Sequence, residues 1–313
     1  MDLKYYIGHS TDESIRYQSS SGGIGSSLIK YLLETRKYGT SMTFVFNVNE
    51  CRYEPQLIYK TDYSKPCGSI YQDTDTIGFI KENLENIRDG IVVTCMPCQV
   101  RPIKAILSRN GINHFIISLC CSGQTSVKGT WCYYRLLGIN KNDVESIQYR
   151  GNGWPSGIQI KLKNGKQIKK DNYTYPWTLM HESLLFRPKR CLYCTFKTSD
   201  DADISLADPW LDEYIEHDHT GNTVAICNDK AIGVIKEMIG KKLIEVVEVD
   251  KDIYVKSQRG TIESKQESIN YKKFNRIVGK MGKDGSIYKK IATSSPFFLK
   301  VHTKLLRVLK CII

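Results

Sequence analysis

The chain has 313 residues, of which 41% are hydrophobic and 25% are charged, so it has room for two domains or one elaborated domain, and wholesale disorder is excluded. Its formal net charge of +12 suits nucleic acid, an anionic membrane surface or an acidic substrate. Much of this charge lies in one segment, because no acidic residue follows Asp284. Basic and aromatic residues are not interleaved as in a nucleic-acid reader, so we expect no nucleic-acid binding.

No targeting segment is recognisable in the sequence. The first residues, MDLKYY, lack the apolar core of a signal peptide, and no run of about 18 apolar residues occurs. We therefore expect a cytoplasmic protein. Eleven cysteines in such a protein indicate reduced thiols and favour metal or catalytic uses over disulfides. Four isolated cysteines are expected to be packing or surface residues: Cys51, Cys132, Cys227 and Cys311.

A serine- and glycine-rich segment, Arg16 to Glu34, is the first distinctive unit. Its SSSGG run at 19–23 leads into apolar residues at helical spacing. Such a loop at a helix N-terminus offers backbone N–H groups and the positive end of the helix dipole to an anion. A capped helix start with flexible glycines is an equally good interpretation. The segment matches neither a Walker A loop nor the G-x-G-x-x-G fingerprint.

Strands and helices alternate in the first half of the chain and predict an α/β layer. Two predicted strands end in cysteine-bearing turns, so a site would lie beyond the carboxyl edge of a sheet. A cysteine next to a helix N-terminus also gains thiolate character. The predicted elements are strands over Thr43–Val48, Gly90–Thr94 and His114–Leu119, a helix over Gln99–Leu107, and the turns Cys95–Cys98 and Cys120–Cys121.

The pattern changes to a β unit from Ser146 onwards. Alternating apolar residues over Ile158–Leu162 and the turn Lys163–Lys166 predict a hairpin that returns through Ile168. The polar, weakly patterned segment Gln258–Gly285 is expected to be a partly mobile excursion. The other predicted elements are a helix-like segment over Leu211–His217, a strand over Asn222–Ile226 and a helix over Ala231–Ile239.

The final segment, Pro296–Ile313, predicts a basic amphipathic helix. Its apolar face comprises Phe298, Val301, Leu305, Leu309 and Ile312. Lys300, Lys304 and Arg307 lie off that face. Such a helix either lies on an anionic membrane surface or docks onto the protein's own core. The first alternative would place the protein peripherally at the inner face of the membrane.

Cys191 and Cys194 form a C-x-x-C pair, which supplies half of a metal site. Zinc and iron–sulfur clusters both usually take four protein ligands. The cysteines available to complete the site are Cys95 or Cys98 and Cys120 or Cys121. Spacing alone favours zinc at least as much as a cluster. The pair His217 and His219 is expected to lie in a solvated acidic turn and not to bind a metal.

Four sequence blocks follow one another in a distinctive order. They are RYQSSSGGIGS at 16–26, PCQV at 97–100, LCCSG at 119–123, and CLYC followed by ADISLADPW within 191–210. Together they resemble the β subunits of hydrogenases and dehydrogenases that use the deazaflavin coenzyme F420, and related chlorophyll-pathway reductases. The likeness spans roughly residues 10–240, and the joint order is much more specific than any single block.

The resemblance implies an iron–sulfur flavoprotein that binds FAD and a 4Fe-4S cluster. The cluster ligands that it implies are Cys98, Cys121, Cys191 and Cys194. The residues that it implies around the flavin are Arg16, Ser19, Ser20, Ser21, Gly22 and Gly23. A flavin takes two electrons and a cluster takes one at a time, so the pair would convert hydride-type chemistry into single-electron transfer.

The chain also departs from the family pattern. Cys95 precedes the expected ligand Cys98, and Cys120 precedes Cys121, so each first member is a rival ligand. Ile70 stands where lysine is common in the family. The ferredoxin-like block that many relatives carry is absent, which implies a separate electron carrier: a ferredoxin-like protein, or a reduced deazaflavin or nicotinamide donor.

The resemblance is to short bacterial members found beside enzymes of surface-polysaccharide biosynthesis, which implies a reductive step on a sugar or lipid-linked intermediate. A zinc-stabilised, non-catalytic interaction protein of the same fold is the alternative. No residue is singled out as a catalytic acid or base. We expect a mixed α/β fold in three parts: an α/β flavin-binding region over 1–145, a β-hairpin and cluster region over 146–255, and a polar excursion with a basic tail over 256–313.

Overall fold

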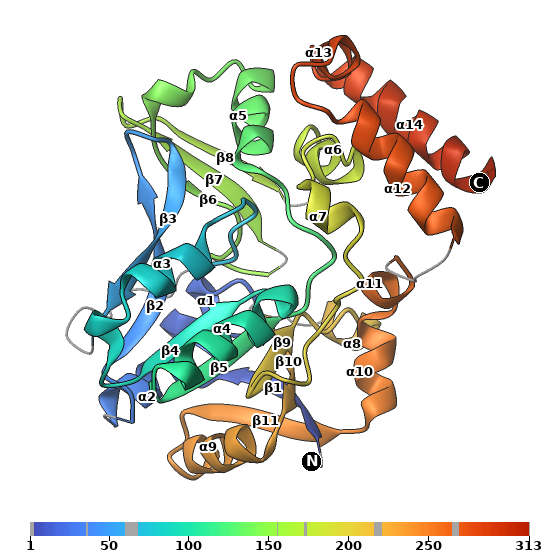
Figure 1. The fold of residues 1–313 in the computed structure, drawn as a ribbon. Coiled ribbons are helices and arrows are strands. Elements are labelled where there is room, and N and C mark those ends of the chain that lie inside the picture. Colours follow the sequence, from blue (N-terminus) through green and yellow to red (C-terminus); the bar gives the residue numbers. More distant parts are fainter. Residues whose placement is uncertain are drawn as a thin grey trace.

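The computed structural model describes residues 3–35, 37–59, 68–154, 156–171, 174–215, 221–264 and 269–312. These form an eight-stranded mixed sheet and a three-stranded antiparallel sheet surrounded by helices, which confirms the expected mixed α/β fold (Figure 1). The strands are β1 (Lys4–Ser10), β2 (Thr40–Asn47), β3 (Arg52–Ile58), β4 (Ile91–Cys95), β5 (His114–Leu119), β6 (Val144–Gln148), β7 (Gly157–Leu162), β8 (Gln167–Asp171), β9 (Ile204–Ala207), β10 (Thr223–Cys227) and β11 (Ile244–Val249).

The larger sheet has a parallel centre and antiparallel edges. Its strand order is β11-β1-β10-β9-β5-β4-β2-β3, and β9, β5, β4 and β2 run parallel. Strand β1 pairs Lys4 with Cys227 of β10 on one side and Ser10 with Ile244 of β11 on the other. Because β4, β5 and β9 are parallel neighbours, the cysteine turns that follow β4 and β5 meet the end of β9 at one edge of the sheet.

Helices cover both faces of the larger sheet. The α-helices are α1 (Glu13–Gln18), α2 (Ile24–Glu34), α3 (Thr76–Glu82), α4 (Pro97–Arg109), α5 (Val127–Leu136), α6 (Trp177–Glu182), α7 (Lys189–Leu192), α8 (Asp212–Ile215), α9 (Asp229–Gly240), α10 (Lys251–Ser257), α11 (Arg259–Ser264), α12 (Ile269–Met281), α13 (Ile287–Ala292) and α14 (Pro296–Ile312). Side chains alternate along each strand, so Phe115 packs with α2 and α9 while Ile116 packs with α3 and α4. Both faces of the central strands are therefore buried.

Most of the expected elements are present. Strand β5 has the predicted bounds, and β4, α4, the β7–β8 hairpin, β10 and α9 differ from expectation by a few residues. Helix α4 begins at Pro97, where a missing N–H costs nothing, and the Gln99 side chain accepts a hydrogen bond from the Met96 N–H. The expected turn with His217 and His219 lies outside the described residues.

The segment Gln258–Gly285, expected to be a partly mobile excursion, is largely helical, and its mobility stays a prediction. This segment contains helices α11 and α12, and Val278 of α12 is fully buried between Leu192 and Leu306. The few apolar side chains of α12 are enough because they pack on α7 and α14, so tertiary contact overrides a weak local pattern.

The smaller sheet belongs to a second hydrophobic core. Strands β6 and β7 pack with α5, α6, α13 and α14 around side chains such as Tyr133, Tyr149 and Trp177. Residues 146–255 contribute most of this sheet and also β9, β10 and β11 of the larger one, so the two expected regions are interleaved. The boundaries at 145 and 255 stay a prediction.

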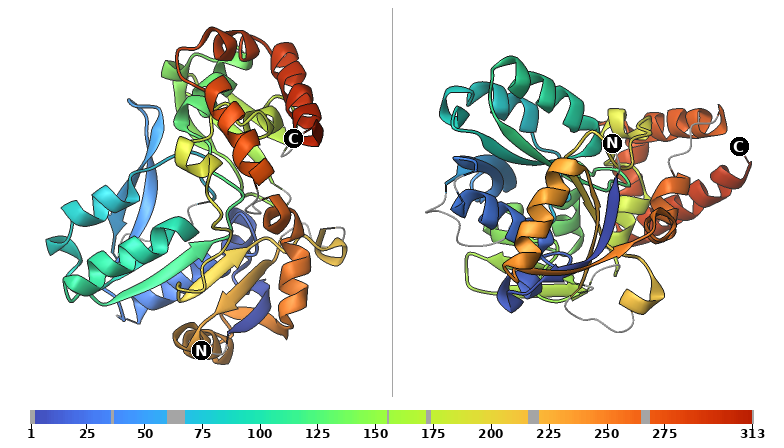
Figure 2. Two further views of the ribbon diagram at one scale, coloured as in Figure 1. Left: turned by 45° about the vertical axis from the view of Figure 1, so that its right-hand side comes forward. Right: turned by 90° about the horizontal axis from the view of Figure 1, so that it is seen from below.

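Helices α12, α13 and α14 gather at one end of the molecule, beside α6 and α7 and away from α9 and β11 (Figures 1 and 2). None of the helices in the described ranges is long and apolar enough to cross a membrane.

Candidate functional site

One large cavity lies at the carboxyl edge of β4, β5 and β9. Its volume is about 800 Å³, within the range of cofactor sites. Three segments that are far apart in the sequence line it together: the serine–glycine loop at 19–23, the cysteine turns after β4 and β5, and the C-x-x-C pair Cys191 and Cys194. The cavity therefore joins both groups of residues that the sequence singles out.

The serine–glycine loop connects α1 to α2 and is held between β1 and β10. The Ser10 N–H donates to the Gly22 carbonyl at 2.7 Å, and the Ser21 hydroxyl donates to the Asn222 carbonyl. Gly22 has a φ of +61°, and a Cβ there would lie 2.8 Å from the Asn222 backbone, so glycine is required. The predicted loop residues that line the cavity are Ser19, Ser20, Ser21 and Gly23. Arg16 lies outside it and donates from Nε to the Gly221 carbonyl at 3.1 Å, and Gly22 faces β10.

Two helix N-termini border the cavity. Gly25 and Ser26 in the first turn of α2 line it, as do Cys98 and Gln99 in the first turn of α4. Neither first turn contains an acidic residue. Both helices thus present N–H groups and the positive ends of their dipoles, an arrangement that suits an anionic group such as a phosphate.

A buried ion pair fixes the loop to the end of β9. Arg150 donates from Nη1 to Asp208 Oδ2 at 2.7 Å and from Nη2 to Asp208 Oδ1 at 3.1 Å. Its Nη2 also donates to the Ser20 carbonyl at 2.8 Å. The Arg150 and Asp208 side chains are only 5% and 13% exposed. One guanidinium therefore sets the distance between the serine–glycine loop and the strand that precedes Trp210.

Four of the cavity cysteines come together from three segments. The Cys98 thiol lies within hydrogen-bonding reach of Cys194, and this bond, burial and the charges of Cys194 and Cys121 raise the pKa of Cys98 above its ordinary value. Cys121 and Cys191 both lie near the Arg187 guanidinium. The structure thus brings Cys98, Cys121, Cys191 and Cys194 to the same wall of the cavity.

The two rival cysteines have other neighbours. Cys95, the last residue of β4, is 2% exposed among apolar side chains such as Ile103, and burial raises the pKa of its thiol to about 12. Cys120 lies within hydrogen-bonding reach of Tyr254 of α10, and burial, followed by the neighbouring Cys120, raises the pKa of that phenol. Both touch the cavity, but Cys95 is a buried thiol of the apolar core, whereas Cys120 is half-buried beside Tyr254.

Arg187 is a site residue that sequence reasoning missed. Its guanidinium packs on Gly123, where an added Cβ would lie 2.5 Å from Arg187 Cζ. Burial lowers the pKa of Arg187, while Cys191 and Cys121 act in the opposite direction. The signal available in the sequence was Gly123 itself, two residues after Cys121, because only a glycine lets the arginine approach the turn.

As they stand, the described Cys, His, Asp and Glu side chains form no group of three that could hold a single metal ion. Ten cysteines are described as free thiols, and Cys67 lies outside the described residues. A cluster of several irons is wider than one ion, so its ligands stand further apart. Four thiols on one cavity wall are the donor set that a 4Fe-4S cluster takes, and they fit such a group in kind.

Comparisons with known proteins identify the family of the chain. Two family models describe the beta subunit of coenzyme F420 hydrogenase/dehydrogenase; the model of its C-terminal part matches residues 88–252, and the model of its N-terminal part matches residues 5–63. The chain is 25% identical to the F420-dependent formate dehydrogenase subunit beta of Methanocaldococcus jannaschii over 301 residues, which cover 86% of this chain and 67% of that protein.

A chain of the F420-reducing nickel–iron hydrogenase complex from Methanosarcina barkeri has a similar fold. The TM-score is 0.63 at 17% sequence identity, over 88% of this chain and 91% of that chain. These relatives are subunits of oxidoreductases, and the sequence blocks that predicted the resemblance lie largely within the matched residues. The chain belongs to the coenzyme F420 hydrogenase/dehydrogenase beta subunit family.

Proposed function

We propose that the protein is an oxidoreductase that binds FAD and a 4Fe-4S cluster in the cavity described above. The observation that carries the proposal is that one cavity of about 800 Å³ is lined both by the serine–glycine loop and by six cysteines. A flavin exchanges two electrons and a cluster one at a time, so the pair would link hydride donors to one-electron carriers.

The cluster would be held by Cys98, Cys121, Cys191 and Cys194. This choice is supported by the contact of Cys98 with Cys194 and by the shared neighbourhood of Cys121 and Cys191 at Arg187. The guanidinium of Arg187 would stabilise the negative charge of the thiolate ligands. Helix α12 supports the same site, because the Tyr271 hydroxyl donates to the Cys194 carbonyl at 3.4 Å and Val278 packs on Leu192.

The flavin would lie along the serine–glycine loop, with its phosphates at the N-terminus of α2. The loop carbonyls are already used by Ser10, Arg150 and Thr223. Its conformation is therefore fixed before any ligand arrives, which lowers the ordering cost of binding. The first turn of α2, with Gly25 and Ser26, borders the same cavity and would face the phosphates.

The electron donor in this proposal is a separate carrier, either a ferredoxin-like protein or a reduced deazaflavin or nicotinamide. The substrate class is a sugar or lipid-linked intermediate of surface-polysaccharide biosynthesis, for which the support is the resemblance to short bacterial members of the family. After reduction with dithionite, addition of nucleotide-linked or lipid-linked sugars should reoxidise the flavin, followed by its absorbance. A flavin that stays reduced with all of these compounds would contradict the substrate class.

Anaerobic purification tests the cofactors. We expect a brown protein with flavin absorbance and with iron and acid-labile sulfide on analysis. Replacing Cys98, Cys121, Cys191 or Cys194 by serine should abolish bound iron, whereas Cys95→Ser and Cys120→Ser should retain it. Cys227→Ser is the matched control, because Cys227 is fully buried in β10 and packs with α2 and α9.

Two results would change the conclusion. A colourless protein with stoichiometric zinc would replace the enzyme by a zinc-stabilised, non-catalytic interaction protein. Loss of iron in Cys120→Ser with retention in Cys121→Ser would reverse the assignment of that ligand.

A further inference from the structure

Helix α14 has a docked face that differs from the apolar face predicted from the sequence. Its buried residues are Leu299, His302, Thr303 and Leu306. His302 links the helix to its neighbours, since Nε2 contacts the Ser183 carbonyl at 2.8 Å and Nδ1 contacts the Tyr288 hydroxyl at 2.7 Å. Arg307 adds an ion pair to Glu182 at the end of α6 at 2.9 Å. The helix is therefore fastened to the protein without using its most apolar stripe.

The apolar stripe of α14 faces outward. Its members are Phe297, Phe298, Val301, Leu305, Val308 and Ile312, which are between 45% and 76% exposed. At about 100° per residue these six side chains fall within a single arc of about 100° on the side opposite Leu299 and Leu306. Helix α13 adds Ile287 and Ile291, which are 76% and 54% exposed. An outward helix face in water is ordinarily polar, so this patch needs a cover.

A row of cations borders the apolar stripe. Lys300, Lys304 and Arg307 lie between the outward stripe and the docked face of α14, and Lys290 and Lys310 are also exposed. No acidic residue occurs between residues 285 and 313. Arg307 is paired with Glu182 of α6, so Lys300 and Lys304 carry the charge beside the stripe. A second copy of this face would bring another row of cations, and the carboxylate beside them, Glu182, is already paired with Arg307. The charge therefore selects an anionic partner.

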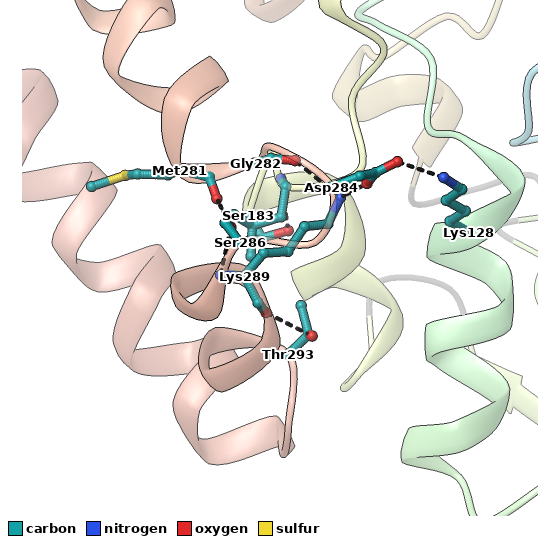
Figure 3. Close-up of polar contacts among 9 residues, drawn as sticks. Lys128, Ser183, Met281, Gly282, Asp284, Ser286, Lys289 and Thr293 are labelled. Atoms are coloured by element: carbon teal, nitrogen blue, oxygen red, sulfur yellow. Dashed lines mark hydrogen bonds and ion pairs between the residues drawn. The ribbon is translucent and has the colours of Figure 1, made fainter.

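The connection between α12 and α13 holds this face in a fixed orientation. Lys128 of α5 pairs with Asp284 at 2.5 Å, and Lys289 of α13 pairs with the same carboxylate at 2.9 Å (Figure 3). Lys289 Nζ also donates to the Gly282 carbonyl at 3.1 Å. These contacts join α13 to the body of the protein, so a surface that binds the patch would bind the whole molecule in one orientation.

From these observations we propose that α13 and α14 form a docking face for a membrane surface that contains anionic phospholipid. Phe297, Phe298 and Val308 would enter the boundary between headgroups and acyl chains, and Lys300 and Lys304 would contact the phosphates. The face would lie in the plane of the interface and would not span the bilayer. This inference does not depend on the cofactors or on the substrate.

Sedimentation with vesicles tests the proposal on the full chain. We expect binding to phosphatidylcholine vesicles that contain phosphatidylglycerol, little binding to phosphatidylcholine alone, and weaker binding as salt rises. The double variant Val301→Glu/Leu305→Glu should lower partitioning by more than about tenfold, because both side chains point outward. Lys304→Glu should lower it by at least about fivefold. Val247→Glu is the matched control, since Val247 is 66% exposed and belongs to β11, which lies at the other end of the molecule from α13 and α14 (Figure 1).

Each other outcome overturns the proposal. Absence of binding to the anionic vesicles, or equal binding to both kinds of vesicle, excludes recognition of anionic lipid. Binding that the double variant leaves unchanged places the contact elsewhere. Self-association in analytical ultracentrifugation that the double variant removes, without vesicle binding, identifies a second copy of the chain as the cover. Circular dichroism of each variant confirms that α14 is retained.

Discussion

Replacing Arg150 by methionine should destabilise the protein far more than loss of an ordinary surface ion pair. The substitution keeps a long apolar stem and removes the guanidinium that donates to both Asp208 carboxylate oxygens and to the Ser20 carbonyl. The Asp208 carboxylate, only 13% exposed, then loses its ion-pair partner inside the protein. We expect the variant to be less stable and its serine–glycine loop to be displaced.

The size of the effect follows from burial. Removing one partner of a buried ion pair typically costs about 3–5 kcal/mol, because the remaining charge has lost the interaction that offset its desolvation. An exposed helical pair is worth about 0.5 kcal/mol. Arg259 and Glu263 form such a pair, with side chains 77% and 54% exposed, so Arg259→Met is the matched control.

Chemical denaturation of both variants measures the difference in the free energy of unfolding. Arg150→Met should lose at least about 3 kcal/mol, whereas Arg259→Met should leave the free energy of unfolding unchanged within the error of the measurement. The double variant Arg150→Met/Asp208→Leu should recover part of the loss, because both charges are then gone. If Arg150→Met costs no more than Arg259→Met, the argument from burial is wrong.

Two further predictions concern pH and backbone packing. Burial, with the Arg187 charge as a smaller cause, lowers the pKa of His181 from 6.5 to about 4. Between these pH values the unfolded chain binds a proton that the folded protein excludes, so the free energy of unfolding should fall as the pH drops through this window. The variant His181→Gln should make the free energy of unfolding less dependent on pH, as measured by denaturation at pH 7 and pH 5. An unchanged slope in that variant would contradict the assignment. Gly8→Ala should lower the stability by about 3 kcal/mol, because the added Cβ would lie 1.9 Å from the Glu245 carbonyl oxygen. Gly233→Ala lies in an exposed turn of α9, where an added Cβ meets no described atom within 4 Å, and should raise the stability by up to about 1 kcal/mol. Equal effects of the two variants on the melting temperature would refute the contrast.

The elements that the sequence predicts well are those whose local pattern and tertiary role agree. Strand β5 is a short apolar run buried on both faces, and α4 carries a proline start and an apolar stripe. Strands β1, β3 and β11 were not expected, because their polar and apolar residues do not alternate clearly. The pairing of β1 also depends on the distant strands β10 and β11, whereas β3 pairs with the neighbouring β2. Helix α12 was likewise not expected, since its helical state depends on α7 and α14.

The sequence likewise predicts one part of the candidate site and not the other. The order of the four sequence blocks is enough to predict that the serine–glycine loop and the C-x-x-C pair belong to one site, and the structure gathers both at one cavity. Which member of each cysteine pair faces the others depends on side-chain direction at the end of a strand. The structure places Cys120 beside Tyr254 and Cys95 beside Ile103, and the local sequence contains no signal for either neighbour.

For α14, the sequence predicts the helix and its apolar stripe but not which side is docked. A stripe of this kind ordinarily faces the core. Here His302 and Thr303, polar by type, occupy the buried side and are hydrogen-bonded there, to the Ser183 and Lys300 carbonyls among others. The choice between two faces was made by specific polar contacts, which periodicity does not reveal.

The position of β1 between β10 and β11 affects how the protein is made. During synthesis at about 5–20 residues per second, residue 227 follows residue 10 by roughly 10–45 s. Throughout that interval the nascent chain carries a strand and a serine–glycine loop whose partners have not left the ribosome. The cavity is therefore completed late in translation, and any insertion of a prosthetic group must wait until most of the polypeptide has been made.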